Sequence, residues 1–301
     1  MSAEPLDWQA IEAPGDDTLL VVVGPTASGK TELALRLAER VGGEIVGADS
    51  VQVYRGFDRG SGKPSADERA RARHHLVDCF DPGDEVDAQR YVALADQAIA
   101  DIRARGRVPI VCGGTFLWVR ALTLGLAPLP AADPAIRAAH QALAEAEGRA
   151  ALHARLAEVD RESADRLSPN DLVRVSRALE IFALTGKPQS ALHAEHGFRS
   201  ARWKTQLVGV DRPREELDLR IAARVQGFLD AGLVDEVRDL RARGFGAARA
   251  MGSVGYRQVN EHLDGALPAD ALHAAIVRAT RVFVRRQRTW LRDEPVRWAR
   301  L

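Results

Sequence analysis

The sequence predicts an α/β protein, with a parallel sheet flanked by helices and an inserted all-helical subdomain. Short apolar runs at 19–23, 44–48 and 108–112 alternate with segments of helical periodicity, and a further run lies near 203–211. Strands that alternate with helices form parallel sheets covered on both faces. The interval 134–196 instead has the pattern of helix almost throughout and is rich in Ala, Arg and Glu.

The predicted domain boundaries follow changes in composition along the chain. Residues 1–17 are polar and acidic and lack the basic and apolar segments of a signal peptide, so we expect a flexible leader there. The proline-rich stretch "LAPLPAADP" separates the core from the insertion. The expected core therefore comprises 18–125 and 200–301, and the expected helical insertion comprises 126–199.

The bulk composition is typical of a water-soluble globular protein. The chain has 301 residues, of which 46% are hydrophobic and 28% charged, with no net charge, and no apolar run is long enough to span a bilayer. Its two cysteines fit a reducing compartment, and neither belongs to a close pair of the kind that binds zinc. We therefore expect a cytoplasmic protein with no membrane partner.

A glycine-rich stretch between the first apolar run and the first helical pattern fits a P-loop. Glycines there let backbone N–H groups point at phosphate oxygens, the lysine adds a positive charge, and the next hydroxyl can hold Mg²⁺. Because the motif follows a strand and opens a helix, the predicted sheet is P-loop NTPase-like. The expected phosphate-binding residues are Gly24, Pro25, Thr26, Ala27, Ser28, Gly29, Lys30 and Thr31, with Thr31 as the metal-binding residue.

The strand expected at 108–112 argues against a plain nucleotide hydrolase. P-loop ATPases usually carry an acidic residue at the end of such a strand, where it organises Mg²⁺ and water. Here "VPIVCGGT" ends in Gly113, Gly114 and Thr115, and no acid follows. Thr115 can donate a hydrogen bond to a phosphate oxygen, cap the next helix, or do both.

An acidic residue follows the second predicted strand instead, in "GADSVQVYRG". Carboxyl ends of parallel strands open onto the ligand crevice, so we expect Asp49 to lie beside the P-loop as a general base or a metal ligand. Gln52 carries an amide suited to reading an adenine edge. Lys63 and the His74–His75 pair could also approach this site, although the histidines by themselves are more often structural.

The last predicted helix, 274–290, has an apolar and a basic face. On a wheel of about 100° per residue, Ile276, Phe283, Val284 and Trp290 share one face. Gln287 lies in the middle of that face, where a buried amide needs partners. Arginines without alternating acids on the opposite face favour contact with a phosphate backbone over a merely solvated surface. They are Arg278, Arg281, Arg285, Arg288 and Arg292.

A set of motifs, in order across nearly the whole chain, resembles the tRNA dimethylallyltransferase family, the isopentenyl transferases that modify an adenosine next to the anticodon. The motifs are "GPTASGKT", "GADSVQVYRGFDRGSGKP", "HHLVD", "VCGGTFLWVRAL", "NDLVRVSRALEIF", "GSVGYRQV" and "ATRVFVRRQRTW". The ordered set is far more specific than a P-loop alone. The chain departs from the family pattern at Ser61–Gly62, Trp118 and Arg285, none of which is the catalytic group implied below.

The resemblance implies a donor, an acceptor and a role for several residues. The P-loop would hold the diphosphate of dimethylallyl diphosphate together with Mg²⁺, and Arg220, with Arg224 one turn later, matches the family's phosphate-binding arginine. Asp49 would accept the proton of adenine N6, which makes Asp49, Thr115 and Arg220 the implied catalytic residues.

The partner implied by the resemblance is the anticodon stem-loop of tRNA, over which the helical insertion would close. A monomer is expected. The implied tRNA contacts are Asp49, Ser50, Val51, Gln52, Arg137, Val173, Arg174, Val175, Ser176, Arg177, Gly252, Ser253, Val254, Gly255, Tyr256, Arg257, Arg281 and Gln287.

Three other functions compete with this one. An isopentenyl transferase acting on free adenine nucleotides would share the P-loop and Asp49 but would not need the arginine-rich helix face. A small-molecule P-loop kinase would turn over ATP. A non-catalytic RNA-binding switch is disfavoured by Asp49 and by the missing acid after 108–112.

Overall fold

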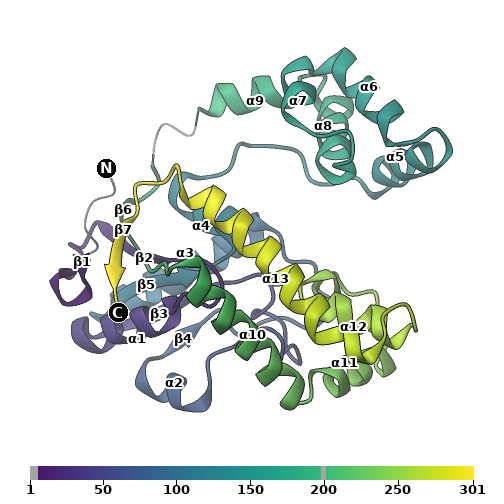
Figure 1. Ribbon diagram of the computed structural model, residues 1–301. Helices are drawn as coiled ribbons and strands as arrows, with labels where there is room; N and C mark the ends of the chain where they lie inside the picture. The colour runs from purple at the N-terminus through teal and green to yellow at the C-terminus, as the bar shows by residue number, and fades with distance from the viewer. Residues whose placement is uncertain (1–5, 198–200) are drawn as a thin grey trace. The chain divides into compact units, whose positions relative to one another are not determined.

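The computed structural model describes residues 6–197 and 201–301, and the chain divides into two compact units (Figure 1). Unit 1 comprises 1–123 and 203–301, and unit 2 comprises 124–202. The two boundaries between the units lie within three residues of those expected from composition, at 125/126 and 199/200. The predicted parallel α/β fold is confirmed.

Unit 1 is built on one sheet. Over the described residues it has seven strands in the order β1-β7-β6-β2-β5-β3-β4, and every pairing between them is parallel. The strands are β1 (Leu6–Asp7), β2 (Thr18–Val23), β3 (Gly43–Ala48), β4 (His74–His75), β5 (Val108–Gly113), β6 (Lys204–Gly209) and β7 (Arg297–Arg300). The central position of β2 places the P-loop in the middle of the carboxyl edge of the sheet.

Alternation along β2 explains why helices cover both faces of the sheet. Leu20 and Val22 point into a core formed with helix α1 (Lys30–Val41), whereas Leu19, Val21 and Val23 point into a larger core on the other face. Because both sides of the strand are apolar, neither face can be left to solvent. The larger core is built with α3 (Ala88–Ala104), α4 (Phe116–Leu124), α10 (Arg214–Asp230), α11 (Leu233–Ala242), α12 (Tyr256–Leu263) and α13 (Ala269–Leu291).

Short elements complete unit 1. Helix α2 (Ala66–Arg71) precedes β4, and the 3-10 turn η2 (Arg249–Gly252) precedes α12. In Figure 1, α13 is the long yellow helix that crosses the unit, and it packs against α10.

The segment expected to be a flexible leader is ordered over its first described residues. Leu6 and Asp7 pair with β7, and a 3-10 turn, η1 (Trp8–Ala10), follows. Ile11 is fully buried, and the Trp8 ring lies under the guanidinium groups of α1. The expectation of flexibility is therefore wrong for 6–11, because two apolar side chains in a polar stretch are enough to dock it. Residues 1–5 lie outside the described part.

Unit 2 is helical over its described residues and has a small core of its own. Helices α6 (Arg149–Val159) and α8 (Leu172–Thr185) contribute Leu152, Leu156, Val175 and Ala178 to this core. Asp160, only 3% exposed, accepts hydrogen bonds from Ser163 and Ser190 and so joins two of the helices. The helices are α5 (Pro134–Ala146), α6 (Arg149–Val159), α7 (Arg161–Arg166), α8 (Leu172–Thr185) and α9 (Gln189–His196).

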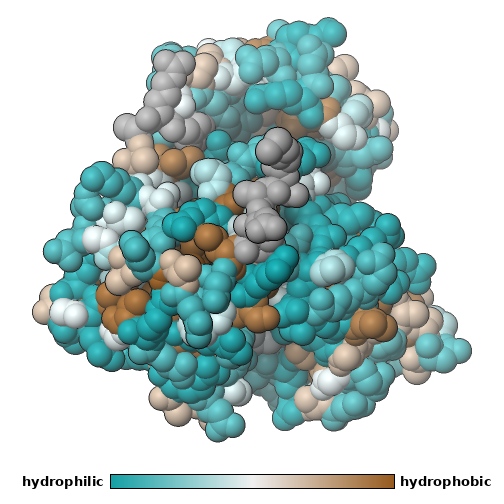
Figure 2. Space-filling view, turned by 60° about the vertical axis from the view of Figure 1, so that its left-hand side comes forward, coloured by the Kyte–Doolittle hydropathy of each residue, from teal (hydrophilic) through white to brown (hydrophobic). Residues whose placement is uncertain are grey.

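In the part of the chain that the structure describes, no helix has the length and apolar character needed to cross a membrane. On the face drawn in Figure 2, hydrophilic side chains predominate and hydrophobic ones gather in small patches.

Candidate active site

The P-loop connects β2 to α1 and has a backbone that depends on glycine at two positions. Gly29 has φ 106°, and Gly24 has φ 158°. A Cβ at Gly24 would lie 2.5 Å from the carbonyl oxygen of Val210 and 2.6 Å from Ser28 Oγ, so no larger residue fits there. Ala27, at φ 67°, also takes the left-handed conformation. The predicted P-loop is thus a tight turn at the start of a helix, a position where backbone N–H groups can point at an anion.

Arg212, which precedes α10, and side chains of α10 and α13 fix the loop from outside. Arg220 Nε donates to the carbonyl of Ala27 and Arg212 Nε to that of Ser28, both at 2.7 Å. Gln287 Oε1 accepts from the N–H of Thr26 at 2.8 Å. Arg220, predicted as a phosphate-binding residue, therefore also positions the loop, and its guanidinium lies beside Gly29.

Lys30 and Arg224 bring positive charge to one place. Burial lowers the pKa of the Lys30 ammonium, and the neighbouring Arg224 guanidinium lowers it further. Burial also lowers the pKa of Arg224, while the Asp49 carboxylate acts in the opposite direction. Two partly desolvated cations in one site attract a polyanion strongly. The only sequence signal for Arg224 is its place one helical turn after Arg220.

Asp49 lies directly after β3, at the edge of the sheet where the prediction placed it. Its Oδ1 accepts hydrogen bonds from the N–H groups of Val51 at 2.9 Å and Gln52 at 3.2 Å. No described residue hydrogen-bonds to Oδ2. Thr115 Oγ1 accepts from the N–H of Ser50 at 3.0 Å, which ties this turn to the end of β5. One carboxylate oxygen thus fixes the turn, and the other is available for chemistry.

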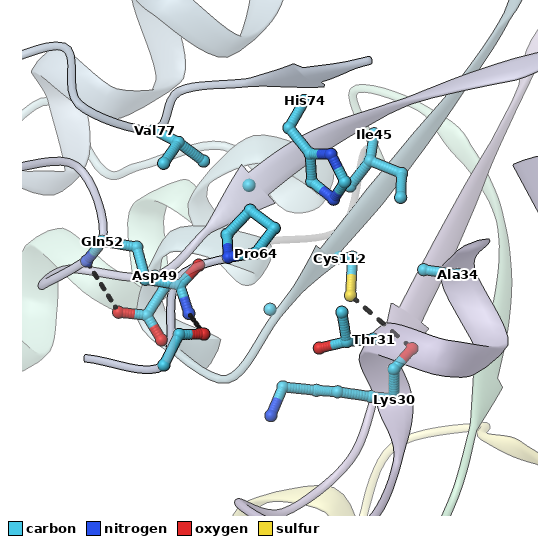
Figure 3. A pocket seen from close by; sticks show the side chains of 13 residues that line it. Lys30, Thr31, Ala34, Ile45, Asp49, Gln52, Pro64, His74, Val77 and Cys112 are labelled. Atoms are coloured by element: carbon cyan, nitrogen blue, oxygen red, sulfur yellow. Dashed lines mark hydrogen bonds between the residues drawn. The ribbon is translucent and has the colours of Figure 1, made fainter. Parts of the chain in front are cut away.

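Lys30, Thr31 and Asp49 line one pocket together with Gln52 (Figure 3). The remaining wall is largely apolar and comes from α1, β3, β5 and the segment 62–77. Its residues are Ala34, Ile45, Gly47, Gly62, Pro64, His74, Val77, Cys112 and Gly113. The site therefore combines cations, one carboxylate and an apolar wall.

Gln52 does not present its amide nitrogen to a base in this structure. Its Nε2 donates to the carbonyls of Gly62 at 2.9 Å and Ser61 at 3.3 Å. Lys63, with 5% of its side chain exposed, donates to the carbonyl of Tyr54 at 2.6 Å and to the carboxylates of Asp58 and Asp78. Lys63 therefore positions the loop that holds Gln52.

The motif Gly252–Arg257 is only partly available to a nucleic acid. Tyr256, at the start of α12, is fully buried, and its hydroxyl donates to Glu236 at 2.7 Å and accepts from the N–H of Gly60 at 3.1 Å. Gly255 is buried as well, whereas Gly252 and Arg257 are exposed. The prediction of tRNA contact is wrong for the Tyr256 side chain, which holds the loop before Lys63.

Helix α13 differs from the helical wheel at Phe283 and at the arginines, whereas Gln287 is buried with partners as the wheel predicts. Phe283 is 39% exposed, because it lies at the edge of the buried arc and not inside it. Gln287 is buried, and its Nε2 donates to the carbonyl of Gly114, so both ends of its amide bind unit 1 rather than tRNA. Acids from outside the helix pair with three of the five arginines: Arg281 with Asp218 at 2.9 Å, Arg288 with Asp211 at 2.8 Å, and Arg292 with Asp293 at 3.6 Å.

The predicted contacts in unit 2 centre on a buried carboxylate. Glu180 has no exposed surface and pairs with Arg137 at 3.0 Å and Arg177 at 2.5 Å. Both arginines are thereby fixed in place. Val175 and Ser176 belong to the unit's interior, at 1% and 8% exposure. Whether a residue of this stretch can contact tRNA therefore depends on the face of the helix it occupies, not on its place in the motif. Val173 is 80% exposed, and Arg174 is also exposed and pairs with Asp171.

Comparisons with known proteins indicate the family of the chain. The family described as "IPP transferase" matches residues 52–294. The chain is 68% identical over 300 residues to a tRNA dimethylallyltransferase of Sorangium cellulosum, covering 100% of this chain and 96% of that protein. It is 54% identical to a protein of the same name from Anaeromyxobacter dehalogenans, over 92% of each chain.

Solved structures give the same result. A tRNA isopentenylpyrophosphate transferase from Bacillus halodurans superposes with TM-score 0.70 at 34% identity, covering 94% of this chain and 89% of that one. A eukaryotic dimethylallyltransferase described as acting on tRNA superposes with TM-score 0.75 at 25% identity, over 92% of this chain and 70% of the other.

Proposed function

Because the chain belongs to the IPP transferase family, we propose that it transfers the dimethylallyl group of dimethylallyl diphosphate to N6 of an adenosine next to the anticodon of tRNA, releasing diphosphate. One observation carries the proposal: Lys30 of the P-loop and Asp49 after β3 line the same pocket. A diphosphate-binding cation and a proton acceptor are thereby held on two sides of one space.

The P-loop and its arginines would bind the diphosphate of the donor. Lys30, Arg220 and Arg224 supply positive charge next to backbone that can turn its N–H groups toward phosphate oxygens. An allylic C–O bond breaks readily once the charge that develops on the leaving diphosphate is stabilised. The largely apolar wall of the pocket suits the hydrocarbon part of the donor.

Asp49 would act on the acceptor. As the C1–O bond to the diphosphate breaks, the bond between C1 and N6 forms, and the carboxylate of Asp49 takes the proton that N6 loses. The adenine must leave its stack to reach this carboxylate. Oδ1 is held by two backbone N–H groups, so Oδ2 is the oxygen available for the proton.

The donor set of the pocket fits Mg²⁺. The hydroxyl of Thr31 and the carboxylate of Asp49 are hard oxygen ligands, and Mg²⁺ in proteins usually takes few side chains beside substrate phosphates and water. Thr31 would hold the ion, which would supply charge neutralisation to the departing diphosphate. We also propose that the protein works as a monomer in the cytoplasm.

A transfer assay tests the proposal directly. Labelled dimethylallyl diphosphate should transfer its label to unmodified tRNA and not to AMP, and the donor should raise the melting temperature because it binds only the folded chain. Label on AMP but not on tRNA would indicate a nucleotide isopentenyl transferase. Tighter binding of ATP than of the allylic diphosphate would indicate a kinase.

A further inference from the structure

His74 places a hydrogen-bond acceptor in the wall of the pocket. Its Nδ1 lies 2.8 Å from the carbonyl oxygen of Ala72, so Nδ1 carries the proton and donates it. Nε2 is then an unprotonated acceptor. Burial lowers the pKa of the imidazole, which keeps the ring neutral. No described residue donates a hydrogen bond to Nε2.

The surroundings of His74 differ from the rest of the site. Figure 3 shows a ring nitrogen of His74 directed toward the interior of the pocket, next to Ile45 and on the side away from Lys30. Ile45, Val77 and Cys112 form the adjacent wall, and the charged groups border the other side of the pocket. The pocket thus has one cation, Lys30, at one end, a short apolar stretch, and one neutral acceptor at the other end.

A purely hydrocarbon donor cannot satisfy that acceptor. When methyl groups cover Nε2 and exclude water, the nitrogen loses its hydrogen bond and gains no replacement. A hydroxyl group at the far end of the donor restores the bond. A ligand that matches the whole pocket therefore has a diphosphate at one end, a five-carbon allylic chain, and a terminal hydroxyl.

We propose that the protein also uses a hydroxylated five-carbon allylic diphosphate as donor, with Nε2 of His74 accepting the hydrogen bond of its terminal hydroxyl. This inference rests on the proposed function, because it uses the same site and reaction. The C1–O bond to diphosphate breaks, the C1–N6 bond forms, Asp49 takes the N6 proton, and the hydroxyl is carried unchanged into the product.

The test compares two donors, dimethylallyl diphosphate and its 4-hydroxy derivative, on unmodified tRNA. Mass spectrometry of the digested nucleosides distinguishes the products, which differ by one oxygen. The wild-type protein should transfer both groups. In His74→Phe, which keeps the ring size but has no acceptor, the ratio of kcat/KM for the hydroxylated donor to that for the plain donor should fall about tenfold.

The conservative variant His74→Gln places an amide oxygen near the position of Nε2 and should recover part of that ratio. Loss of folding in either variant would be detected by thermal melting, and the wild-type comparison alone still tests donor use. If the wild type transfers only the dimethylallyl group, or if the ratio is unchanged in His74→Phe, the inference is overturned and the proposed function stands. If neither group reaches tRNA, the proposed function itself fails.

Discussion

Gln287, near the end of α13, accepts a hydrogen bond at 2.8 Å from the backbone N–H of Thr26, 261 positions earlier in the P-loop. The other end of the same amide donates to the carbonyl of Gly114 at 3.2 Å. Gln287 therefore holds the glycine-rich loop 24–31 against the end of β5. Replacement of Gln287 should change donor binding, although the family resemblance implies that Gln287 contacts tRNA.

In Gln287→Leu, the N–H of Thr26 loses its partner, and we expect the affinity for dimethylallyl diphosphate to fall about tenfold. Isothermal titration measures it. Arg286→Gln is the matched control, because Arg286 is exposed on the same helix and forms no ion pair with any described residue. A loss of tRNA affinity with unchanged donor affinity would contradict the positioning role and would instead support a contact between Gln287 and tRNA.

Asp49→Asn tests the general base. The Asn side-chain oxygen can still accept from Val51 and Gln52, so the turn should keep its shape while the proton acceptor is lost. We expect the single-turnover rate to fall by about 10²–10⁴-fold with donor affinity nearly intact. Asp293→Asn, an exposed aspartate just beyond α13, serves as control. Near-normal turnover in Asp49→Asn would remove Asp49 from the mechanism.

The arginines of α13 should contribute unequally to tRNA binding. Within the described chain Arg278 and Arg285 form no ion pair, whereas Arg281 and Arg288 face carboxylates of unit 1. Replacing Arg278 and Arg285 with Gln should flatten the dependence of log affinity on log salt by about two units, if each contacts a phosphate. The paired double variant, Arg281→Gln with Arg288→Gln, should flatten it less.

Filter binding of tRNA at several salt concentrations measures both slopes. Glutamine has nearly the helix propensity of arginine, so folding should be retained in both double variants. Equal slopes in all three proteins would show that this face is solvated and that the contacts lie elsewhere.

Glu180→Gln should raise the KM for tRNA several-fold and leave the KM for the donor unchanged. The carboxylate holds Arg137 and Arg177 in fixed positions, and a neutral amide cannot pair with both guanidinium groups. Steady-state kinetics with each substrate varied in turn gives both constants. Glu195→Gln removes an exposed ion pair with Lys187 in the same unit and is the control. A tRNA KM like that of the wild type would limit Glu180 to a structural role.

Glu44 at the start of β3 should make stability depend on pH in the acidic range. Hydrogen bonds from Arg105 and from His75 hold the pKa of this nearly buried carboxyl at about 2, against an ordinary value of 4.5. A lowered folded-state pKa stabilises the protein above pH 4.5, and that contribution is lost as the pH falls from 4.5 toward 2.

Urea denaturation at pH 6, 4 and 3 measures this loss. Glu44→Gln should be less stable than the wild type at pH 6, and the difference should shrink at pH 3. If the difference in unfolding free energy between the two proteins is the same at all three pH values, the charge of Glu44 does not stabilise the native state.

The sequence by itself determined the elements whose signals are local. Strand runs, the P-loop glycines and the position of Asp49 after a strand depend on neighbouring residues, because periodicity and positive φ act over a few positions. Once strands alternate with helices, the parallel order of the sheet brings Asp49 and Lys30 to one edge without further information. The ordered set of motifs also indicated the family to which the chain belongs.

Tertiary structure alone decided which polar side chains remain available to contact a substrate. A helical wheel shows which residues of α13 share a face, but it cannot show that an acid of α10 lies opposite them. Asp218, which neutralises Arg281, lies 63 positions earlier in the chain. Tyr256 and Gln287 have motif positions typical of contact residues, yet their polar atoms are used by Gly60, Thr26 and Gly114. Buried donors and acceptors must find partners wherever the fold brings them close, and no local pattern in the sequence records those pairings.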